Sequence, residues 1–260
     1  MHLHRTDTQR FPFAITDDAV LGGRLKLLQP ARGHRAGHDA ILLAAAAPKA
    51  NIAVDLGAGI GTAGLALLAR NAARHVTLVE IDEDLARLGR TNAKRNGFAD
   101  RAESIQADVE KLARRGGPPK PAAASADLVI MNPPFNDPAR RRASPDETRK
   151  RAHAAPVGSV ESWVQAADRL LKASGRLVLI HRPEAIAAIL GALEGRFGAA
   201  EIVPIHAKAR GPAIRIIVRA QKGKRTRPLL LAGFVLAGPD GRPTDEAEAV
   251  LRGAATLDSA

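Results

Sequence analysis

Cysteine and tyrosine are both absent from this chain of 260 residues. The absence of cysteine excludes disulfide bonds, thiolate metal sites and a cysteine nucleophile. The histidines, His2 and His4 included, show no spacing typical of metal ligands, so we predict no metal site. Aromatic side chains are few, with one Trp and six Phe. A phenylalanine inside a polar, proline-rich loop is therefore an unusual choice for this chain.

The chain also lacks an uninterrupted apolar run long enough to cross a membrane. Its first residues, Met1–Arg5, do not resemble the apolar segment of a secretory signal. The lack of cysteine agrees with a reducing compartment. We therefore expect a soluble, cytoplasmic protein that makes no membrane contact.

Negative charge is scarce relative to positive charge. The chain has 27 Asp and Glu against 39 Lys and Arg, which gives a formal net charge of +12. Such an excess favours polyanionic partners, because their bound counterions are released when a basic protein binds. Nucleic acid is the leading candidate, since the basic residues also cluster. A composition biased towards Arg and Ala by a GC-rich genome is the alternative explanation.

Strand-like apolar segments alternate with helical segments from residue 52 onwards. Continuous apolar strands separated by helices are typical of a parallel sheet covered on both faces. We therefore predict an α/β fold: a Rossmann-like, mainly parallel seven-stranded sheet with helices on both faces, plus a short N-terminal extension. Two successive strands near the end predict an antiparallel pair at one edge. The expected strands are 52–56, 75–81, 102–107, 127–131, 175–181, 200–206 and 213–221, with a last strand at 229–236, and the expected helices are 62–73, 83–96, 109–115, 159–172, 184–196 and 244–252.

The segment before the first of these strands is expected to be an extension, residues 1–50, packed on the main domain, residues 51–260. Within it, Val20–Leu28 predicts a hairpin with two glycines at the turn. A basic, glycine-rich loop then leads into a helix from about Asp39 to Ala47, which Pro48 ends.

Three glycines at every second position, Gly57, Gly59 and Gly61, occupy the first crossing from strand to helix. Glycine lets the backbone approach a ligand closely at a helix N-terminus. A dinucleotide fingerprint requires glycine where Thr62 stands, and the carboxylate of Asp55 would repel dinucleotide phosphates. A carboxylate at that position suits a cationic amino group instead. The motif therefore favours S-adenosylmethionine, with Asp55, Gly57, Ala58, Gly59 and Gly61 as binding residues.

Acidic residues also end the next two predicted strands. Glu80 is placed to accept both ribose hydroxyls of the cofactor, and Ile81 to lie against its adenine ring. Asp108, followed by Val109, is placed to accept a hydrogen bond from the adenine amino group. Asp82 and Asp108 have a second interpretation as N-caps of the following helices, and for Asp108 the two roles are compatible. Ligand binding at the carboxyl ends of strands is typical of open α/β sheets.

The fourth predicted strand ends in Asn132-Pro133-Pro134-Phe135. An amide oxygen and a backbone carbonyl, held by two rigid prolines, suit the two N–H groups of a planar amino nitrogen. The phenylalanine ring offers a stacking face for a flat heterocycle. A plain proline-rich turn after a strand is the alternative, and the acids on the preceding strands decide against it.

With these motifs the chain resembles the class I S-adenosylmethionine-dependent methyltransferases, in the subgroup that acts on planar amino or amide nitrogens. Its N-terminal segment, Leu21–Leu43, and its ending, Leu236–Gly241, resemble the bacterial valine-tRNA adenine-N6 methyltransferases, which modify the adenine beside the anticodon. Phe135 stands where tyrosine is frequent in that family, and His38 where a smaller residue is frequent. Phe135 keeps the stacking face, so the chemistry is not affected.

The resemblance implies a role for each motif. Asn132, Pro133, Pro134 and Phe135 would hold and orient the adenine, and Asn132 would also border the cofactor. Gly37, His38 and Asp39 would line the methionine end of S-adenosylmethionine. The target tRNA would be gripped through its phosphates by basic residues that recur along the chain, although each basic run taken alone is compatible with a solvated face. Besides the residues given below, the basic residues include Lys208, Arg210 and Arg215 after the sixth strand and the run Lys222–Arg227. The residues expected to contact RNA are Arg32, Arg35, Arg140, Arg141, Arg142, Arg149, Lys150 and Arg151.

Three other functions remain open at this point. A guanine-N2 ribosomal RNA methyltransferase and a release-factor glutamine-N5 methyltransferase would use the same motifs. The glutamine enzymes usually carry a helical N-terminal domain, for which the sequence before Ile52 is too short. An RNA-binding or chaperone protein on a methyltransferase scaffold is the non-enzymatic alternative, but such a scaffold should have lost its acids or Asn132.

Overall fold

The structure is a computed structural model that describes residues 11–32, 37–114, 120–134 and 160–257. Among the helices of these ranges, none combines the length and the apolar character needed to span a bilayer. The described residues also contain no group of three or more His, Asp or Glu side chains arranged to hold a metal ion.

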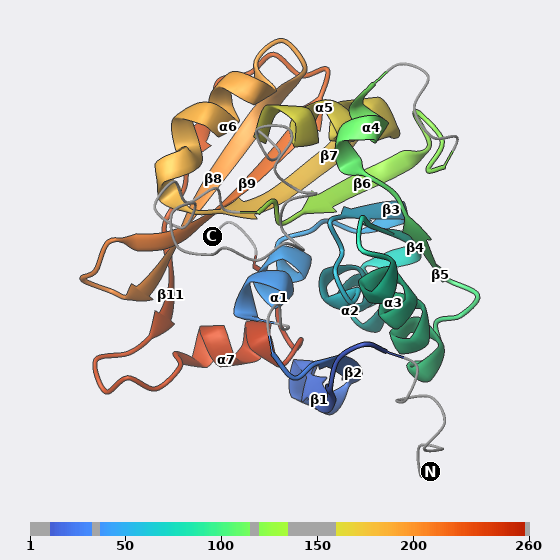
Figure 1. Ribbon diagram of the computed structural model, residues 1–260. Coiled ribbons are helices and arrows are strands. Elements are labelled where there is room, and N and C mark those ends of the chain that lie inside the picture. The colour runs from blue at the N-terminus through green and yellow to red at the C-terminus, as the bar shows by residue number, and fades with distance from the viewer. Residues whose placement is uncertain (1–10, 33–36, 115–119, 135–159, 258–260) are drawn as a thin grey trace, which may run out of the picture.

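A large sheet forms the centre of the molecule (Figure 1). Its strands are β3 (Ala50–Leu56), β4 (Ala73–Glu80), β5 (Ala102–Gln106), β6 (Ala126–Met131), β7 (Leu171–His181), β8 (Phe197–Lys208), β9 (Ala213–Lys222), β10 (Leu229–Leu230) and β11 (Phe234–Ala237). In the described part of the chain the order is β10-β8-β9-β7-β6-β3-β4-β5, and β11 also pairs with β8. Only β9 runs antiparallel to its neighbours among these strands. The predicted mainly parallel α/β fold is confirmed: β3 to β9 are the seven strands, and two short strands extend along β8.

Helices cover both faces of the sheet because the side chains of each central strand point alternately to the two sides. The helices are α1 (His38–Ala45), α2 (Thr62–Ala69), α3 (Glu83–Arg95), α4 (Val109–Ala113), α5 (Val160–Leu170), α6 (Ile186–Leu193) and α7 (Asp245–Leu251). Leu128 and Ile130 of β6 join a core with α1, α2, α3 and α7, whereas Val129 and Met131 join a second core with α4, α5 and α6. In Figure 1, α5 and α6 lie above the sheet and α1 to α3 below it.

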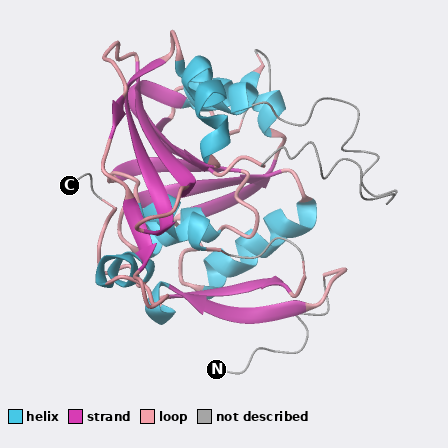
Figure 2. Ribbon diagram, turned by 90° about the vertical axis from the view of Figure 1, so that its left-hand side faces the viewer, coloured by secondary structure: helices cyan, strands magenta, loops and turns pink. Residues whose placement is uncertain are grey.

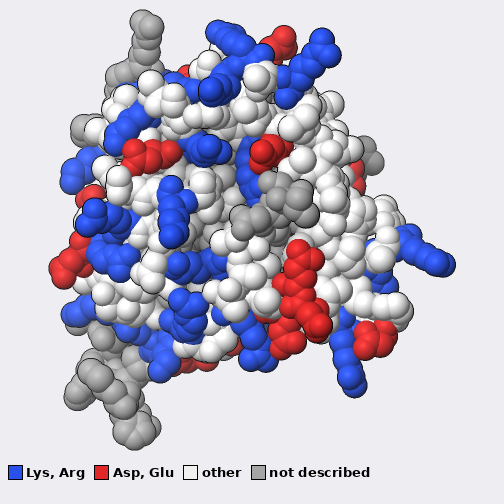
Figure 3. All heavy atoms as spheres, turned by 180° about the vertical axis from the view of Figure 1, so that it is seen from behind, with Lys and Arg blue, Asp and Glu red and all other residues white. Residues whose placement is uncertain are grey.

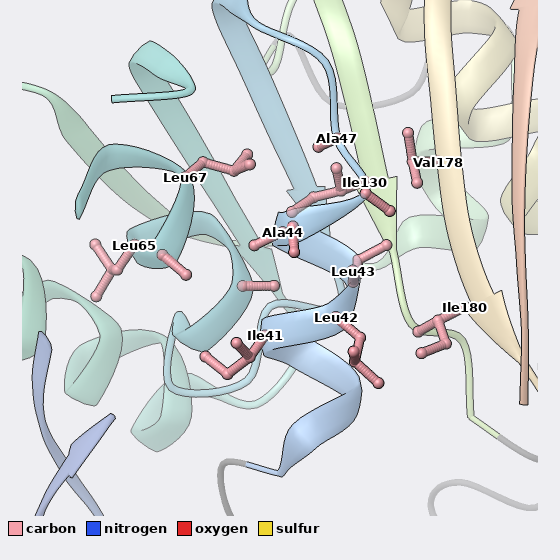
Figure 4. Packing of buried hydrophobic residues seen from close by; sticks show 14 of the residues in the cluster. Ile41, Leu42, Leu43, Ala44, Ala47, Leu65, Leu67, Ile130, Val178 and Ile180 are labelled. Carbon is pink, nitrogen blue, oxygen red and sulfur yellow. The ribbon is translucent and has the colours of Figure 1, made fainter. Parts of the chain in front are cut away.

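Helix α1 lies deep in the first core. Residues 41–47 are all buried, because this Ile/Leu/Ala segment is apolar on every side. Figure 4 shows α1 between Leu67 of α2 and the side chains of Ile130, Val178 and Ile180 on β6 and β7. The C-terminal segment closes over the other end of the helix, where the backbone N–H of Leu257 donates to the carbonyl of Ala45. This packing fixes where the N-terminus of α1 lies.

The N-terminal segment forms the predicted hairpin, β1 (Ile15–Val20) and β2 (Leu25–Pro30), which is longer than the sequence indicated. In Figure 2 it lies near the N-terminus, apart from the main sheet. The side chain of Asn92 on α3 accepts from the N–H of Leu28 and donates to its carbonyl. The amide of Asn92 thus makes the two backbone hydrogen bonds that a neighbouring strand would otherwise make with Leu28. Asn96, one turn later, bonds Lys26 in the same way.

Several predicted elements have different bounds in the structure; the expected helix 62–73, for example, ends at Ala69, and β4 begins at Ala73. The expected last strand, 229–236, is divided into β10 and β11, both parallel to β8, with residues 231–233 between them. The expected helix at 159–172 ends at Leu170, and β7 follows directly at Leu171. Local sequence patterns do not show these boundaries because pairing with β6 and β8 sets them.

Candidate active site

A pocket of about 430 Å³ opens at the carboxyl edge of the sheet, where β3 and β6 end and α1 begins. Strand β3 lies between β6 and β4, so the ends of these three parallel strands meet at one place. The residues around the pocket are Gly37, His38, Asp39, Ala40, Asp55, Gly57, Ala58, Gly59, Ile60, Thr62, Ala63, Leu85, Asn132 and Arg215.

The three glycines of the turn between β3 and α2 all have positive φ, but different surroundings require them. A Cβ on Gly57 would lie 2.5 Å from the indole of Trp163, and one on Gly61 would lie 2.8 Å from Leu78. A Cβ on Gly59 would meet nothing within 4 Å. Gly57 and Gly61 are therefore required by packing, whereas Gly59 leaves open space beside the pocket.

Asp55 is a buried carboxylate at the base of this turn, only 2% exposed. Its Oδ2 accepts from the backbone N–H of Gly64 at 2.8 Å. Burial, together with a smaller repulsion from the Glu80 carboxylate, raises the pKa of Asp55 to about 7, although the hydrogen bond from Gly64 acts in the opposite direction. A cationic ligand group near these two acids would offset both effects, so the pocket fits a ligand that carries an ammonium group at this end.

Glu80 ends β4 and is held in one orientation by three backbone N–H groups. Its Oε2 accepts from Gly59 at 2.8 Å, and its Oε1 accepts from Ile81 at 2.8 Å and from Asp82 at 3.0 Å. The carboxylate thus joins the glycine turn to the start of α3. Ile81 beside it is 63% exposed, so its side chain offers an apolar surface on which a flat ring could lie.

The first turn of α1 forms the rim of the pocket. Gly37 is the N-cap of the helix, and His38 and Asp39 follow it. Asp39 Oδ2 accepts from Nε of Arg215 at 2.7 Å, and both side chains are about one quarter exposed. Because Arg215 lies on β9, this ion pair joins the start of α1 to a strand two places beyond β6 in the sheet.

Asn132 and the two prolines follow β6 directly. Asn132 is half-buried and lines the pocket, Pro133 is buried, and Pro134 is exposed. The proline rings fix the backbone at the point where the chain leaves the sheet, which limits the positions of the Asn132 amide and the Pro133 carbonyl. His181 ends the neighbouring strand β7; burial lowers its pKa, and the positive charges of Arg182 and Arg215 lower it further.

Most of the residues expected to bind the cofactor lie at this pocket. Those that line it are Gly37, His38, Asp39, Asp55, Gly57, Ala58, Gly59 and Asn132. Those that do not line it are Gly61, Glu80, Ile81, Asp108 and Val109. The N-cap interpretations of Asp82 and Asp108 are confirmed, since Asp82 accepts from the N–H groups of Asp84 and Leu85 and Asp108 accepts from that of Glu110.

Sequence reasoning did not place six of the lining residues at the pocket, namely Ala40, Ile60, Thr62, Ala63, Leu85 and Arg215, although Arg215 was counted among the basic residues that could contact RNA. Four of them adjoin predicted positions and could be found by extending the motifs by a residue or two. Leu85 and Arg215 could not, because only tertiary packing brings α3 and β9 to the pocket. The expected site residues Arg35, Phe135, Arg140, Arg141, Arg142, Arg149, Lys150 and Arg151 lie outside the described residues, and Arg32 lies inside them.

Comparisons with known proteins agree with this geometry. The model of the methyltransferase small domain family matches residues 36–209. A tRNA1(Val) (adenine(37)-N6)-methyltransferase of Erwinia tasmaniensis is 28% identical over 212 residues, which cover 79% of this chain and 82% of the relative. The enzyme of the same name from Aeromonas hydrophila is 31% identical over 158 residues, 56% of this chain and 58% of the relative.

A solved structure resembles this chain over an even larger share of its length than these relatives do. A crystal structure from Agrobacterium tumefaciens, described as a predicted O-methyltransferase, matches with a TM-score of 0.70 and 31% identity, and covers 84% of this chain and 98% of that one. The family model, the relatives and this structure all indicate the same class of enzyme. The chain therefore belongs to the methyltransferase small domain family, and it is a methyltransferase that uses S-adenosylmethionine.

Proposed function

We propose that this enzyme transfers a methyl group from S-adenosylmethionine to the N6 amino group of an adenine in tRNA, the adenine beside the anticodon of tRNA1(Val). The observation that carries the proposal is the position of Asn132, which lines the pocket at the end of β6, the strand next to the one that bears Asp55. The names of the relatives from Erwinia tasmaniensis and Aeromonas hydrophila support this choice of substrate.

The cofactor's methionine end is assigned to the part of the pocket between Asp55 and the first turn of α1. Asp55 would receive the amino group, which accounts for a buried carboxylate beside a second acid. Gly59 would let the backbone lie close to the cofactor. Glu80 and Ile81 would bind the ribose and the adenine ring, and Asp108 would accept from the adenine amino group. S-adenosylmethionine supplies an electrophilic methyl group on a sulfonium.

Asn132 would activate the target nitrogen by accepting one of its hydrogens at Oδ1, while the Pro133 carbonyl accepts the other. Adenine N6 is a poor nucleophile because its lone pair is delocalised into the ring. Two fixed acceptors move electron density onto the nitrogen and favour its rehybridisation as the new C–N bond forms. The nitrogen then releases one proton to solvent, so no titrating base is needed. Phe135 would stack on the base.

Charge supports an RNA substrate over a protein substrate. The chain carries a formal net charge of +12. On the face seen from behind, Lys and Arg side chains are numerous and Asp and Glu are fewer (Figure 3). A basic surface attracts a polyanion over distances of about 10 Å at moderate salt. A glutamine on a protein would gain little from such a surface.

The test is methylation of bulk tRNA and ribosomal RNA with labelled S-adenosylmethionine, followed by separation of the nucleosides. The proposal expects N6-methyladenosine in tRNA. N2-methylguanosine in ribosomal RNA, a ribose or other O-methyl product, or labelled protein would each overturn it. The O-methyl product is included because the matched structure from Agrobacterium tumefaciens is described as a predicted O-methyltransferase.

A further inference from the structure

Arg215 is placed at the active-site pocket by the one strand that runs against the others in the described sheet. Strand β9 pairs antiparallel with β7, and Ile216 lies opposite His181 at the end of β7. The start of β9 therefore lies at the carboxyl edge, where the parallel strands end. Among the described residues around the pocket, Arg215 carries the only guanidinium or ammonium group.

The guanidinium of Arg215 is fixed by two hydrogen bonds but remains partly exposed to solvent. Nε donates to Asp39 Oδ2 at 2.7 Å, and Nη1 donates to the carbonyl of Ile214, also at 2.7 Å. The side chains of Arg215 and Asp39 are 26% and 25% exposed. A partly exposed ion pair of this kind contributes little free energy, so an incoming anion can share the guanidinium with the Asp39 carboxylate or replace it at little cost.

The order of the strands separates two halves of the site. Asp55 and Glu80 lie on β3 and β4, on one side of Asn132, and Arg215 lies on β9, on the other side. The cationic groups of S-adenosylmethionine are attracted to the half with the two acids. The other half carries the guanidinium of Arg215, which is paired with Asp39 on one edge and can still donate hydrogen bonds to the anionic part of the second substrate.

We propose that Arg215 binds a phosphate group of the target nucleotide and so fixes the base at Asn132. This inference rests on the proposed function, because an RNA substrate supplies the phosphate. A planar guanidinium can donate two parallel hydrogen bonds to phosphate oxygens, which gives orientation as well as affinity. Asp39 holds the guanidinium in place before the RNA arrives, and its position at the cofactor rim joins the two halves of the site.

The experiment is a double-mutant cycle between this side chain and one RNA phosphate. The RNA is an anticodon stem-loop in which the phosphate 5′ or 3′ to the target adenosine is replaced in turn by a neutral methylphosphonate. The proteins are the wild type, Arg215→Gln, Arg215→Lys and, as a matched loss of charge, Arg242→Gln. Arg242 lies between β11 and α7 and is 87% exposed. The measurements are the Kd for RNA, kcat, KM and the Kd for S-adenosylhomocysteine.

We expect Arg215→Gln to weaken RNA binding and raise KM about 10-fold, because a charge-assisted hydrogen bond is lost. One of the two methylphosphonates should have the same effect on the wild type and none on Arg215→Gln. Arg215→Lys should keep part of the affinity, and Arg242→Gln should stay within about two-fold of the wild type. Affinity for S-adenosylhomocysteine should not change in any variant.

Additive effects of Arg215→Gln and of both methylphosphonates would overturn the proposal, as would a loss of S-adenosylhomocysteine affinity as large as the loss of RNA affinity. If Arg215→Gln does not fold, as judged by circular dichroism, Arg215→Lys carries the same cycle. A wild type that makes no N6-methyladenosine would refute the proposed function, while the RNA-binding arm would still decide whether Arg215 contacts a phosphate.

Discussion

Two carboxylates, Asp55 and Glu80, are less than a tenth exposed at the ends of neighbouring strands. Burial first, and then repulsion from Glu80, raise the pKa of Asp55 from 3.8 to about 7. In the free enzyme Asp55 is therefore partly protonated at neutral pH. In the proposed complex it must ionise to pair with the cationic amino group of the cofactor, so ligand binding would be coupled to proton release at this residue.

Affinity for S-adenosylhomocysteine should therefore rise as the pH rises from 6 to 8 and level off above the pKa of Asp55, which is about 7. Isothermal titration calorimetry across this range measures the affinity and the protons released. Asp55→Asn should bind more weakly at pH 8 and lose the pH dependence. An unchanged pH dependence in that variant would show that another group titrates.

The raised pKa of Asp55 affects the stability of the free protein in the opposite direction: stability decreases, rather than increases, as the pH rises. The pKa of Asp55 in the folded state, about 7, lies above its unfolded value of 3.8. The unfolded state therefore loses its proton first, and stability falls as the pH rises from about 4 to about 7 and stays constant above. The unfavourable electrostatic free energy of the buried carboxylate therefore lies at the proposed ligand site, where a bound ammonium group would offset it.

Two glycines of the turn are expected to have different roles, Gly57 in packing and Gly59 in ligand binding. Gly57→Ala should lower the melting temperature, because its Cβ would meet Trp163 at 2.5 Å. Gly59→Ala should cost only about 1–2 kcal/mol of backbone strain but should weaken S-adenosylhomocysteine binding, since its Cβ projects into open space beside the pocket. Thermal melts and binding titrations on both variants measure the two effects. Equal losses of affinity in both variants would contradict the distinction.

At the scale of the element, α3 connects the N-terminal hairpin to the glycine turn through one buried side chain. Asn92 is fully buried, accepts from the N–H of Leu28, and donates to the carbonyls of Leu28 and Ile60. Ile60 belongs to the turn that borders the pocket. The hairpin therefore supports the active site without contributing a side chain to it.

Asn92→Ala should destabilise the protein by about 2–4 kcal/mol, because three backbone groups lose their partner in a buried place. Asn96→Ala is the matched control, since it bonds Lys26 in the same way at a more exposed position and should cost about 1 kcal/mol or less. Urea unfolding of both variants gives the two values. Similar losses would mean that burial of Asn92 is not the source of its contribution.

Elements were predictable from the sequence wherever a local pattern decides them. The apolar segments gave β3 to β9 within a few residues, and Asp55, Gly59 and Asn132 were found because strand ends and glycine turns are local features. Arg215 was expected only as one of several basic residues that could contact RNA; its place at the pocket was not found, because the antiparallel direction of β9 brings it there. The contact of Trp163 with Gly57 was not found either, since more than a hundred residues separate the two positions.

At the scale of the whole molecule, two buried acids, Asp55 and Glu80, lie at the proposed cofactor end of the site, while the net charge of the chain is strongly positive. The two charge patterns serve different ligands: the buried carboxylates suit the cationic groups of the cofactor, and the basic surface suits RNA. Because the basic surface is exposed, its attraction is screened by salt, whereas the buried acids are screened much less.

The affinity for tRNA should therefore fall steeply with salt, and the affinity for S-adenosylhomocysteine should not. A plot of log Kd for tRNA against log salt concentration should be linear, with a slope close to the number of phosphates contacted. Fluorescence anisotropy between low and moderate salt measures it. A flat plot would contradict the assignment of RNA as the partner.

The central claim is that Asn132 activates a nucleobase amino group beside a cofactor held by Asp55. The most direct measurement is the single-turnover rate of N6-methyladenosine formation in tRNA by Asn132→Ala, together with its Kd for S-adenosylhomocysteine. We predict a rate lower by about 10²-fold or more, because an acceptor that stabilises the transition state is lost, with cofactor affinity nearly unchanged. A rate equal to that of the wild type would contradict the account.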